Sequence, residues 1–316
     1  MNEVDHLIIS NTIDYSTDLI CIQFQKRGLN YLRINRDKFL ECDIIYSLLD
    51  NSLIVKTNNE EYILFCDSLK SIYFRAPVFL RNSKTYSLSQ QLYRSQWSAF
   101  IRNLIVFDKC KWVNHPVSTY RAENKMYQLK VAKEIGFLIP DTIVGNCSTE
   151  FVKTSKYYIV KSLDTALFHD GNNELFTYST KILGCELNDA ELQEAPVIIQ
   201  KYLEDKTDIR VTIIEDQLFP VKITKDSCGI DGDWRKMSKD LLEYTSITLP
   251  TDVENKIREI MKRLNLKFGG MDLIMSNDNY YFIEVNPTGE WGWLKYSSEL
   301  EIDIAIADCL NNQVGG

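Results

Sequence analysis

Gly269-Gly270-Met271-Asp272-Leu273 begins one predicted strand of this chain, and Phe282-Ile283-Glu284-Val285-Asn286-Pro287 ends the next. The intervening Ser276-Asn277-Asp278-Asn279 has the composition of a hairpin turn. Antiparallel pairing around that turn brings the start of the first strand to the end of the second. Asp272 is therefore expected to face Glu284 and Asn286, which share one side of their strand because they are two residues apart.

Two carboxylates and one amide oxygen on adjoining strands form a set of hard oxygen ligands. Mg²⁺ prefers such ligands, and substrate phosphates and water complete its coordination. The same segment also fits a charged hairpin in which Pro287 only marks the end of the pairing. The first interpretation makes Asp272, Glu284 and Asn286 a candidate metal site, and the second is kept as the alternative.

The chain before this hairpin predicts an α/β (α+β) protein with three units, the first of which covers residues 1–115. An apolar run at 6–10, a helix from Ser16 that Gly28 ends, and a strand at 31–34 form a β-α-β opening. A hairpin is expected around 56–61, and a further strand at 71–74. The next helix is expected over 89–106, with these apolar residues on one face: Leu92, Trp97, Phe100, Ile101 and Leu104.

The second and third units are expected at 116–194 and 195–316. The second begins with a helix over 123–135, whose apolar positions include Met126, Leu129 and Ala132, and continues with strands at 142–144 and 157–161. The third contains strands at 197–200, 209–214 and 219–223, before the hairpin described above. A helix over 252–264 is expected to bury Val253, Ile257, Ile260, Met261 and Leu264.

The composition is that of an ordinary folded protein. Of 316 residues, 45% are hydrophobic and 25% are charged, which excludes collagen-like, low-complexity and disordered classes. The net charge of −8 gives no global basic field, so no nucleic-acid partner is expected. No segment approaches the roughly 20 apolar residues that span a bilayer, so no membrane partner is expected.

The cysteines and the N-terminus point to a cytoplasmic protein. None of the 8 cysteines is spaced as Cys-x-x-Cys, which excludes a zinc knuckle and a thioredoxin-like motif. The N-terminus is acidic and is not followed by a long apolar run of the kind found in signal peptides. We therefore expect reduced thiols in the cytoplasm.

Met-Asp-Leu followed by Ile-Glu-Val-Asn-Pro resembles the closing motif of ATP-grasp carboxylate ligases, and the upstream motifs of that family occur in the required order. Glu123-Asn124-Lys125 opens a helix and Ile159-Val160-Lys161 ends a strand. The resemblance implies that Lys125 and Lys161 contact the phosphates of ATP. It also implies a fold with an N-terminal α/β domain, a central lid domain and a C-terminal catalytic domain.

Two further segments resemble the nucleotide site of that family. Ile198 to Leu203 is similar to the strand end whose backbone holds the adenine, so the implied contacts are Gln200, Lys201, Tyr202 and Leu203, with Glu204 on the ribose. Asp208-Ile209-Arg210 resembles the Asp-x-Arg strand, in which the arginine faces the transferring phosphoryl group and Asp208 lines the nucleotide site. The alternative is that Asp208 and Arg210 form only a cross-strand charge pair.

The residue types suit this chemistry. A carboxylate attacks the γ-phosphate of ATP, and the acyl phosphate that forms is opened by a second nucleophile. The charge on the transferring group is met by Mg²⁺, lysine and arginine. Lysines suit phosphate as compact cations, and an arginine on a strand can present its fork to phosphoryl or carboxylate oxygens. No Gly-x-x-x-x-Gly-Lys-Ser/Thr sequence is present, which excludes a P-loop nucleotide site.

Four more segments narrow the resemblance to the graspetide (microviridin-type) ligases, which close esters or amides between side chains of a ribosomally made precursor peptide. These segments are Ile72 to Pro77, Arg121 to Lys125, Asp233-Trp234-Arg235 and Glu290-Trp291-Gly292-Trp293. The resemblance implies a precursor peptide with leader and core as partner, and a homodimer. Arg235 is then the acceptor of the core carboxylate, and a surface arginine beside a packed tryptophan is the alternative.

Two features depart from the family pattern. Ala76 stands where related ligases often carry a second basic residue, which weakens the case for a charge role near Arg75. Only Gly171 and Gly184 lie between Lys161 and Ala195, which weakens the case for a glycine-rich phosphate lid. The expected function is an ATP- and Mg²⁺-dependent peptide macrocyclase. The alternatives are a ligase that adds a free amino acid or small amine to a carboxylate, and a catalytically silent peptide-binding relative.

Overall fold

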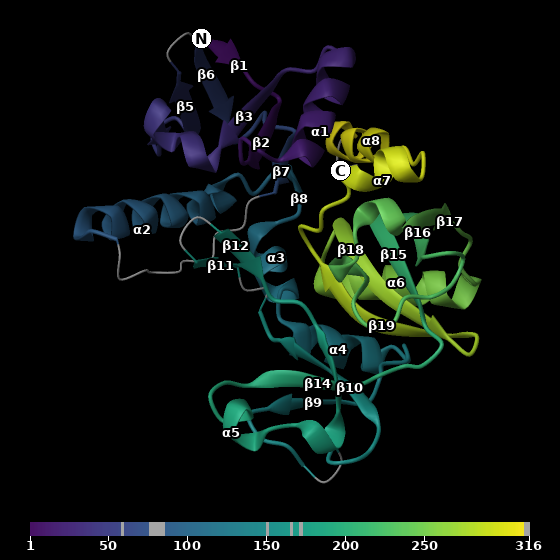
Figure 1. The fold of residues 1–316 in the computed structure, drawn as a ribbon. Coiled ribbons are helices and arrows are strands. Elements are labelled where there is room, and N and C mark those ends of the chain that lie inside the picture. The colour runs from purple at the N-terminus through teal and green to yellow at the C-terminus, as the bar shows by residue number, and fades with distance from the viewer. Residues whose placement is uncertain (58–59, 76–85, 150–151, 165–166, 171–172, 313–316) are drawn as a thin grey trace.

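The structure is a computed structural model that describes the chain apart from residues 58–59, 76–85, 150–151, 165–166, 171–172 and 313–316 (Figure 1). Its helices and strands form three units that follow one another along the chain. Among the described residues, no helix is both long enough and apolar enough to cross a bilayer.

The first unit is built on two sheets. One is parallel, in the order β3–β2–β7–β8, and consists of β2 (His6–Ser10), β3 (Tyr31–Asn35), β7 (Ser71–Phe74) and β8 (Lys111–Val113). The other, in the order β1–β6–β5–β4, consists of β1 (Asn2–Glu3), β4 (Asp43–Ser47), β5 (Ser52–Lys56) and β6 (Glu61–Phe65). The strands β5 and β6 form the predicted hairpin, whose tip at 58–59 lies outside the described residues.

The predicted β-α-β opening is confirmed by α1 (Tyr15–Lys26), which connects β2 to β3. The helix begins after Asp14, whose carboxylate accepts a hydrogen bond from Thr17 N at 3.2 Å. Gly28 follows the helix with φ +64°, a left-handed conformation that costs glycine little. The end of β2 and the start of α1 therefore lie at the same edge of the parallel sheet.

The predicted helix in the second half of this unit is α2 (Leu88–Asn103). Trp97, Phe100, Ile101 and Leu104 pack into the core that covers the parallel sheet, as expected. The prediction for Leu92 is wrong, because this side chain is exposed. At about 100° per residue, Leu92 lies on the opposite side of the helix from Ile101.

The central unit contains an antiparallel sheet in the order β13–β10–β14–β9. Its strands are β9 (Thr142–Gly145), β10 (Tyr157–Ser162), β13 (Thr180–Leu183) and β14 (Val197–Lys201). Because β14 pairs with β10 and β9, it belongs to this sheet and not to a third unit starting at 195. We therefore place the boundary after Lys201.

Three helices and a hairpin complete the central unit: α3 (Pro116–Ala122), α4 (Lys125–Glu134), α5 (Asp189–Leu192), and β11 (Leu167–Asp170) with β12 (Asn173–Phe176). Leu129 and Ala132 of α4 are buried as predicted, whereas Met126 is exposed. Gln128 is buried instead, because its side-chain amide exchanges two 2.8 Å hydrogen bonds with the backbone of Val285. These bonds fasten α4 to the second strand of the predicted hairpin.

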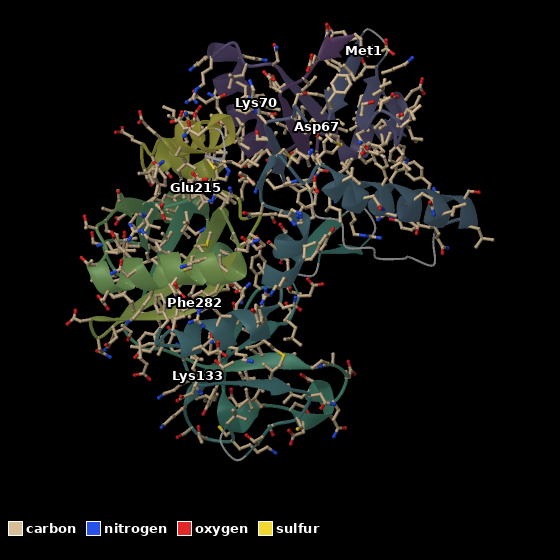
Figure 2. The ribbon with its side chains drawn as sticks, turned by 180° about the vertical axis from the view of Figure 1, so that it is seen from behind. Met1, Asp67, Lys70, Lys133, Glu215 and Phe282 are labelled. Atoms are coloured by element: carbon tan, nitrogen blue, oxygen red, sulfur yellow. The ribbon has the colours of Figure 1, made fainter. Side chains whose placement is uncertain are left out.

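The C-terminal unit is a five-stranded antiparallel sheet in the order β17–β16–β15–β18–β19. The strands are β15 (Thr207–Ile214), β16 (Gln217–Thr224), β17 (Glu243–Ser246), β18 (Phe268–Ser276) and β19 (Asn279–Asn286). α6 (Thr251–Leu264) covers one face of this sheet, and Figure 2 shows it from that side. The five residues predicted as the apolar side of this helix are all buried.

The last two helices, α7 (Gly292–Ser297) and α8 (Ile302–Asn311), return to the first unit and pack beside α1 (Figure 1). Gln23 of α1 donates a 2.7 Å hydrogen bond to Asp303, and Arg27 forms a 2.6 Å ion pair with Asp308. The chain thus closes on its own N-terminal unit, and the segment between β19 and α7 lies against both units.

Candidate active site

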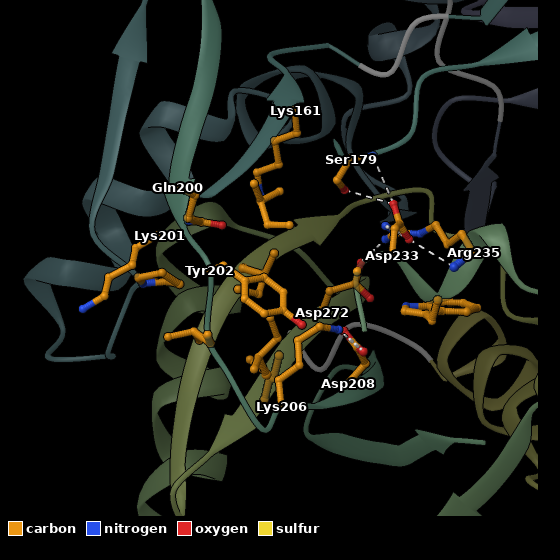
Figure 3. A pocket seen from close by; sticks show the side chains of 18 of the residues that line it. Lys161, Ser179, Gln200, Lys201, Tyr202, Lys206, Asp208, Asp233, Arg235 and Asp272 are labelled. Carbon is orange, nitrogen blue, oxygen red and sulfur yellow. Dashed lines mark hydrogen bonds and ion pairs between the residues drawn. The ribbon is translucent and has the colours of Figure 1, made fainter. Parts of the chain in front are cut away.

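A pocket with about 660 Å³ of empty space lies between the central sheet and the C-terminal sheet (Figure 3). The predicted site residues on its lining are Lys161, Gln200, Lys201, Tyr202, Leu203, Asp208, Arg235 and Asp272. The remaining predicted residues do not line it, but three of them join it through ion pairs. Lys125 and Glu284 pair with each other, Glu284 pairs with Arg235, and Arg210 pairs with Asp272.

The two strands of the C-terminal hairpin bring two of the three candidate metal ligands, Asp272 and Glu284, opposite each other as predicted. Asp272 on β18 is the direct partner of Glu284 on β19, and Gly270 is the partner of Asn286. The ladder shifts register after Asp272, and such bulges re-aim neighbouring side chains. The Asn286 Oδ1 accepts a 3.0 Å hydrogen bond from Thr288 N, so this exposed amide also shapes the following turn.

Within the described residues, no three His, Cys, Asp or Glu side chains form a metal-binding group. The candidate set is instead two carboxylates, from Asp272 and Glu284, with Asn286 two residues after Glu284 on the same strand. Mg²⁺ is commonly bound by one or two carboxylates together with substrate phosphates. The donor set therefore fits magnesium held jointly by the protein and a phosphorylated ligand.

Four cationic side chains surround this carboxylate pair. Arg210 contacts Asp272 at 2.9 Å, Arg235 contacts Asp272 at 2.5 Å and Glu284 at 3.4 Å, and Lys125 contacts Glu284 at 3.3 Å. Burial alone would raise the pKa of Glu284, but Lys161, Lys125 and Arg235 lower this pKa to about 2. Glu284 is therefore ionised across the physiological pH range.

Of these four cations, Lys161 is the one whose charged group has the fewest polar partners among the described residues. No hydrogen bond or ion pair joins its Nζ to another described residue, and Figure 3 shows its side chain in the pocket. Burial lowers the pKa of Lys161, and the nearby charge of Glu284 opposes that shift. The Nε of Arg210 is also buried without a hydrogen-bond partner. An excess of buried, unsatisfied donors of this kind fits the phosphate chain of a nucleotide.

Arg210 lies in a slot that only glycine can form. A Cβ added to Gly270 would lie 2.1 Å from Arg210 Nη2, and one added to Gly289 would lie 2.4 Å from the same atom. Gly270 is two residues before Asp272, and Gly289 is three residues after Asn286. Sequence reasoning noted the first glycine only as part of a strand and missed the second, because the slot forms from segments that the folded chain brings to Arg210.

The predicted adenine segment runs along the end of β14. The Gln200 side chain donates a 2.9 Å hydrogen bond to Thr142 Oγ1, and Lys201 N donates to Asp141 O at 2.8 Å. Tyr202 OH donates to Asp231 at 2.5 Å. Leu203 lines the pocket, whereas Glu204 is exposed and is not part of the lining. The segment is thus anchored on both sides of the pocket, and Glu204 lies at its outer edge.

Asp208 and Arg210 do not pair with each other, and each pairs with a different charged residue. Asp208 forms an ion pair with Lys206, and Arg210 is the direct cross-strand partner of Asp272. Burial raises the pKa of Asp208, and Lys206 opposes this shift. Sequence reasoning missed Lys206, which is itself buried and lines the pocket.

Arg75, for which the sequence offered only a weak case for a charge role, holds the turn that follows β19. Its guanidinium donates to Thr288 O at 2.5 Å and to Gly289 O at 3.1 Å, and it pairs with Glu290 at 3.0 Å and with Asp14 at 3.4 Å. Arg75 therefore has a charge role despite Ala76, although residues 76–85 lie outside the described part of the chain. It connects the N-terminal unit to the turn beside Arg210.

Comparison with known proteins gives the fold. Residues 180–310 match the RimK-like ATP-grasp domain. No curated protein matches the sequence. A RiPP-associated ATP-grasp ligase of Chryseobacterium gregarium, in complex with ADP and a leader and core peptide, has a TM-score of 0.85 at 24% identity, with 100% of both chains covered.

Two further solved structures are similar over nearly the whole chain. The macrocyclase MdnC of Microcystis aeruginosa MRC, bound with precursor peptide MdnA, has a TM-score of 0.81 at 23% identity, covering 96% of this chain and 98% of MdnC. The ATP-grasp ligase PsnB, complexed with a phosphomimetic variant of a minimal precursor, Mg and ADP, has a TM-score of 0.76 at 17% identity, with 98% of both chains covered. The chain therefore has the ATP-grasp fold that its motifs implied.

Proposed function

We propose that this ATP-grasp protein is an ATP-dependent carboxylate ligase that closes rings in a ribosomally made precursor peptide. It would activate an Asp or Glu side chain of the peptide as an acyl phosphate and join it to a Thr or Ser hydroxyl, as an ester, or to a Lys amine, as an amide. ADP and phosphate are the other products. The observation that carries this proposal is the convergence of Asp272 and Glu284 with four cations beside one pocket.

The charges of the pocket suit phosphoryl transfer. Two carboxylates, Asp272 and Glu284, face four cations: Lys125, Lys161, Arg210 and Arg235. The protein alone therefore leaves an excess of positive charge at this place, which a polyphosphate bound with magnesium can neutralise. Lys125 and Lys161 would hold phosphates, and the candidate metal ligands would hold Mg²⁺. When bound, Mg·ATP supplies the phosphoryl group and neutralises the charge that develops on it.

The positions of the arginines separate their roles. Arg210 is buried in its glycine slot, where it can stabilise the transferring phosphoryl group. Arg235 is 39% exposed, lines the pocket, and has its guanidinium 5.4 Å from the centre of the Trp234 ring. A guanidinium that is partly exposed to solvent can bind the carboxylate of another molecule by donating two parallel hydrogen bonds to it. Arg235 therefore would orient the peptide carboxylate toward the phosphate.

The peptide substrate is supported by the similar structures. The Chryseobacterium enzyme holds a leader and core peptide, MdnC holds a precursor peptide, and PsnB holds a minimal precursor with Mg and ADP. Because these likenesses extend over almost the whole chain, they include the region around Arg235. A homodimer is implied by the graspetide-type motifs of the sequence, and a cytoplasmic location is favoured by its cysteine pattern.

Intact-mass analysis tests the proposal. The protein is incubated with ATP, Mg²⁺ and a candidate precursor peptide encoded beside its gene, and the expected result is the loss of one water per ring. Base lability of the product then separates an ester from an amide. The loss should depend on Glu284, so Glu284→Gln should form neither ADP nor product while its thermal unfolding curve keeps the wild-type shape.

The alternative functions give different outcomes in the same assay. An unchanged peptide mass, with ADP formed when free amino acids are added, identifies a ligase for small amines. No ADP under any of these conditions identifies a peptide-binding protein without catalysis. Full turnover by Glu284→Gln contradicts the metal assignment whatever the substrate.

A further inference from the structure

Two side chains at the edge of the central sheet reach across the pocket to the segment that carries Arg235. Ser179, immediately before β13, donates to Asp233 Oδ2 from its backbone N at 3.2 Å and from its Oγ at 2.9 Å (Figure 3). Lys181, within β13, forms a 2.6 Å ion pair with Asp231. Both contacts therefore join the start of the same edge strand to the same short segment, residues 231–235.

Asp233 divides its two carboxylate oxygens between the sheet and Arg235. While Oδ2 accepts both hydrogen bonds of Ser179, Oδ1 accepts a 3.1 Å hydrogen bond from the backbone N of Arg235. The same Oδ1 lies 3.6 Å from the guanidinium of Arg235, and the Asp233 side chain is only 4% exposed. A single buried carboxylate thus connects the central sheet to both the backbone and the charge of Arg235.

The second contact includes the predicted adenine segment. The Lys181 Nζ lies 4.5 Å from the centre of the Tyr157 ring and 4.1 Å from that of the Tyr202 ring. Tyr202 OH donates to Asp231, the partner of Lys181. The wall of the nucleotide pocket and the Arg235 segment are therefore fastened together at two places.

The need for such a fastening follows from the other partners of Arg235. In this structure its guanidinium also contacts Asp272 and Glu284. These are the carboxylates that would hold magnesium, and a metal ion competes with Arg235 for their oxygens. Once they bind the metal, Asp233 is the ion-pair partner that Arg235 keeps among the described residues.

We propose that Asp233 and Ser179 are positioning residues, which hold Arg235 at a fixed place relative to the nucleotide-binding sheet when the metal takes the other carboxylates. The identity of the group that Arg235 receives, a peptide carboxylate, rests on the proposed function above. The holding contact itself does not, since it is formed by this chain alone.

Ser179→Ala tests the contact with a small change. It removes the Oγ hydrogen bond to a buried carboxylate and keeps the backbone one, so the kcat/KM for the precursor peptide should fall about tenfold. The KM for ATP should change less than twofold, because Ser179 makes no described contact with the phosphate-binding lysines. Ser179→Thr keeps a hydroxyl and should restore most of the activity.

Asp233→Asn should have a larger effect. An amide has one acceptor oxygen, whereas Asp233 accepts hydrogen bonds on both oxygens, so the amide nitrogen must face a donor on one side.

Ser238→Ala is the matched control, because this exposed serine lies in the same region and its hydroxyl makes no hydrogen bond to a described residue. Its kinetics should equal those of the wild type.

Hydrogen exchange gives a readout that does not depend on the substrate. In the absence of ligands, amides in residues 231–236 should exchange at least threefold faster in Ser179→Ala than in the wild type, and at the wild-type rate in Ser238→Ala. Unchanged hydrogen exchange in Ser179→Ala overturns the proposal. An equal increase in the KM for ATP and in the KM for peptide also overturns it. Faster exchange in a protein whose wild type cyclises no peptide supports the holding contact and refutes the proposed function.

Discussion

Arg75→Ala should lower the free energy of unfolding by about 3–4 kcal/mol. Arg75 is 5% exposed and connects α1 of the N-terminal unit to the turn after β19 through four acceptors. Truncation removes the cation and leaves these acceptors without it. The size of the effect depends on which of them are buried.

Most of the expected loss comes from Asp14. Its side chain is 10% exposed, and removing one partner of a buried ion pair costs about 3–5 kcal/mol. We take the lower end, because Asp14 keeps hydrogen bonds from Ser10 and Thr17 at 2.7 and 2.8 Å. Glu290 is 54% exposed, so its pair contributes less than about 1 kcal/mol. The carbonyls of Thr288 and Gly289 each lose one hydrogen bond, which together adds about 1 kcal/mol.

Urea denaturation measures this effect against a matched control. Arg27→Ala also removes an arginine that joins α1 to the C-terminal part of the chain, but its partner Asp308 is 51% exposed. That variant should lose less than about 1 kcal/mol. Arg75→Lys should lose an intermediate amount, because one ammonium cannot reach the same set of acceptors. Equal losses for Arg75→Ala and Arg27→Ala would refute the reasoning from burial.

Two further substitutions test the surroundings of the site. Gly270→Ala should reduce kcat by at least about 100-fold, because its Cβ would lie 2.1 Å from Arg210 Nη2 and displace a group that stabilises the transition state; Gly145→Ala, where a Cβ meets nothing within 4 Å, should leave kcat unchanged. Burial raises the pKa of Glu123 to about 7, helped by Asp164 and opposed by Lys125. The stability that this group contributes is present below its ordinary pKa and lost as pH rises through 7, so Glu123→Gln should gain up to about 3 kcal/mol relative to the ligand-free wild type between pH 4.5 and 8. Urea titrations at several pH values measure that difference, and a difference that does not vary with pH would contradict the shifted pKa.

The parts of the fold that sequence predicted best are those in which neighbours along the chain are neighbours in space. The bulge after Asp272, which shifts its partner from Ile283 to Glu284, could not be read from the spacing. The turn at Ser276–Asn279 and the antiparallel pairing of β18 with β19, which bring these two carboxylates close together, did follow from local sequence. The buried stripe of α6 followed from its period in the same way.

The helix α8 shows why other elements could not be predicted. Its apolar residues Ile302, Ile304 and Ile306 alternate with other residues, which is the period of a strand. The helix packs against α1, α7 and the strands β7, β8 and β15, which bury most of its side chains, including Asp303. Its exposed face is narrow, and Ile304 lies on that face between the polar Glu301 and Asp308, so the polar residues mark the helical period only weakly. The spacing of apolar residues indicates a helix or a strand only when one side of the element is exposed to water. A segment that is buried on most sides can therefore show the spacing of the wrong element.

The same distinction explains the site. The motifs named the groups that would touch the nucleotide, because those groups lie on strands whose short-range order is visible in sequence. The groups that hold them come from elsewhere: Arg75 is more than 200 residues from the turn it binds, and Ser179 lies 54 residues from Asp233. Arg75 lies in the motif from Ile72 to Pro77, but that motif does not show which turn the side chain binds, and Ser179 belongs to no motif. A holding contact needs only a donor of the right length at the right place in space. The residues expected to touch the nucleotide could therefore be predicted from the sequence. The contacts that position Arg210 and Arg235 could be found only in the folded structure.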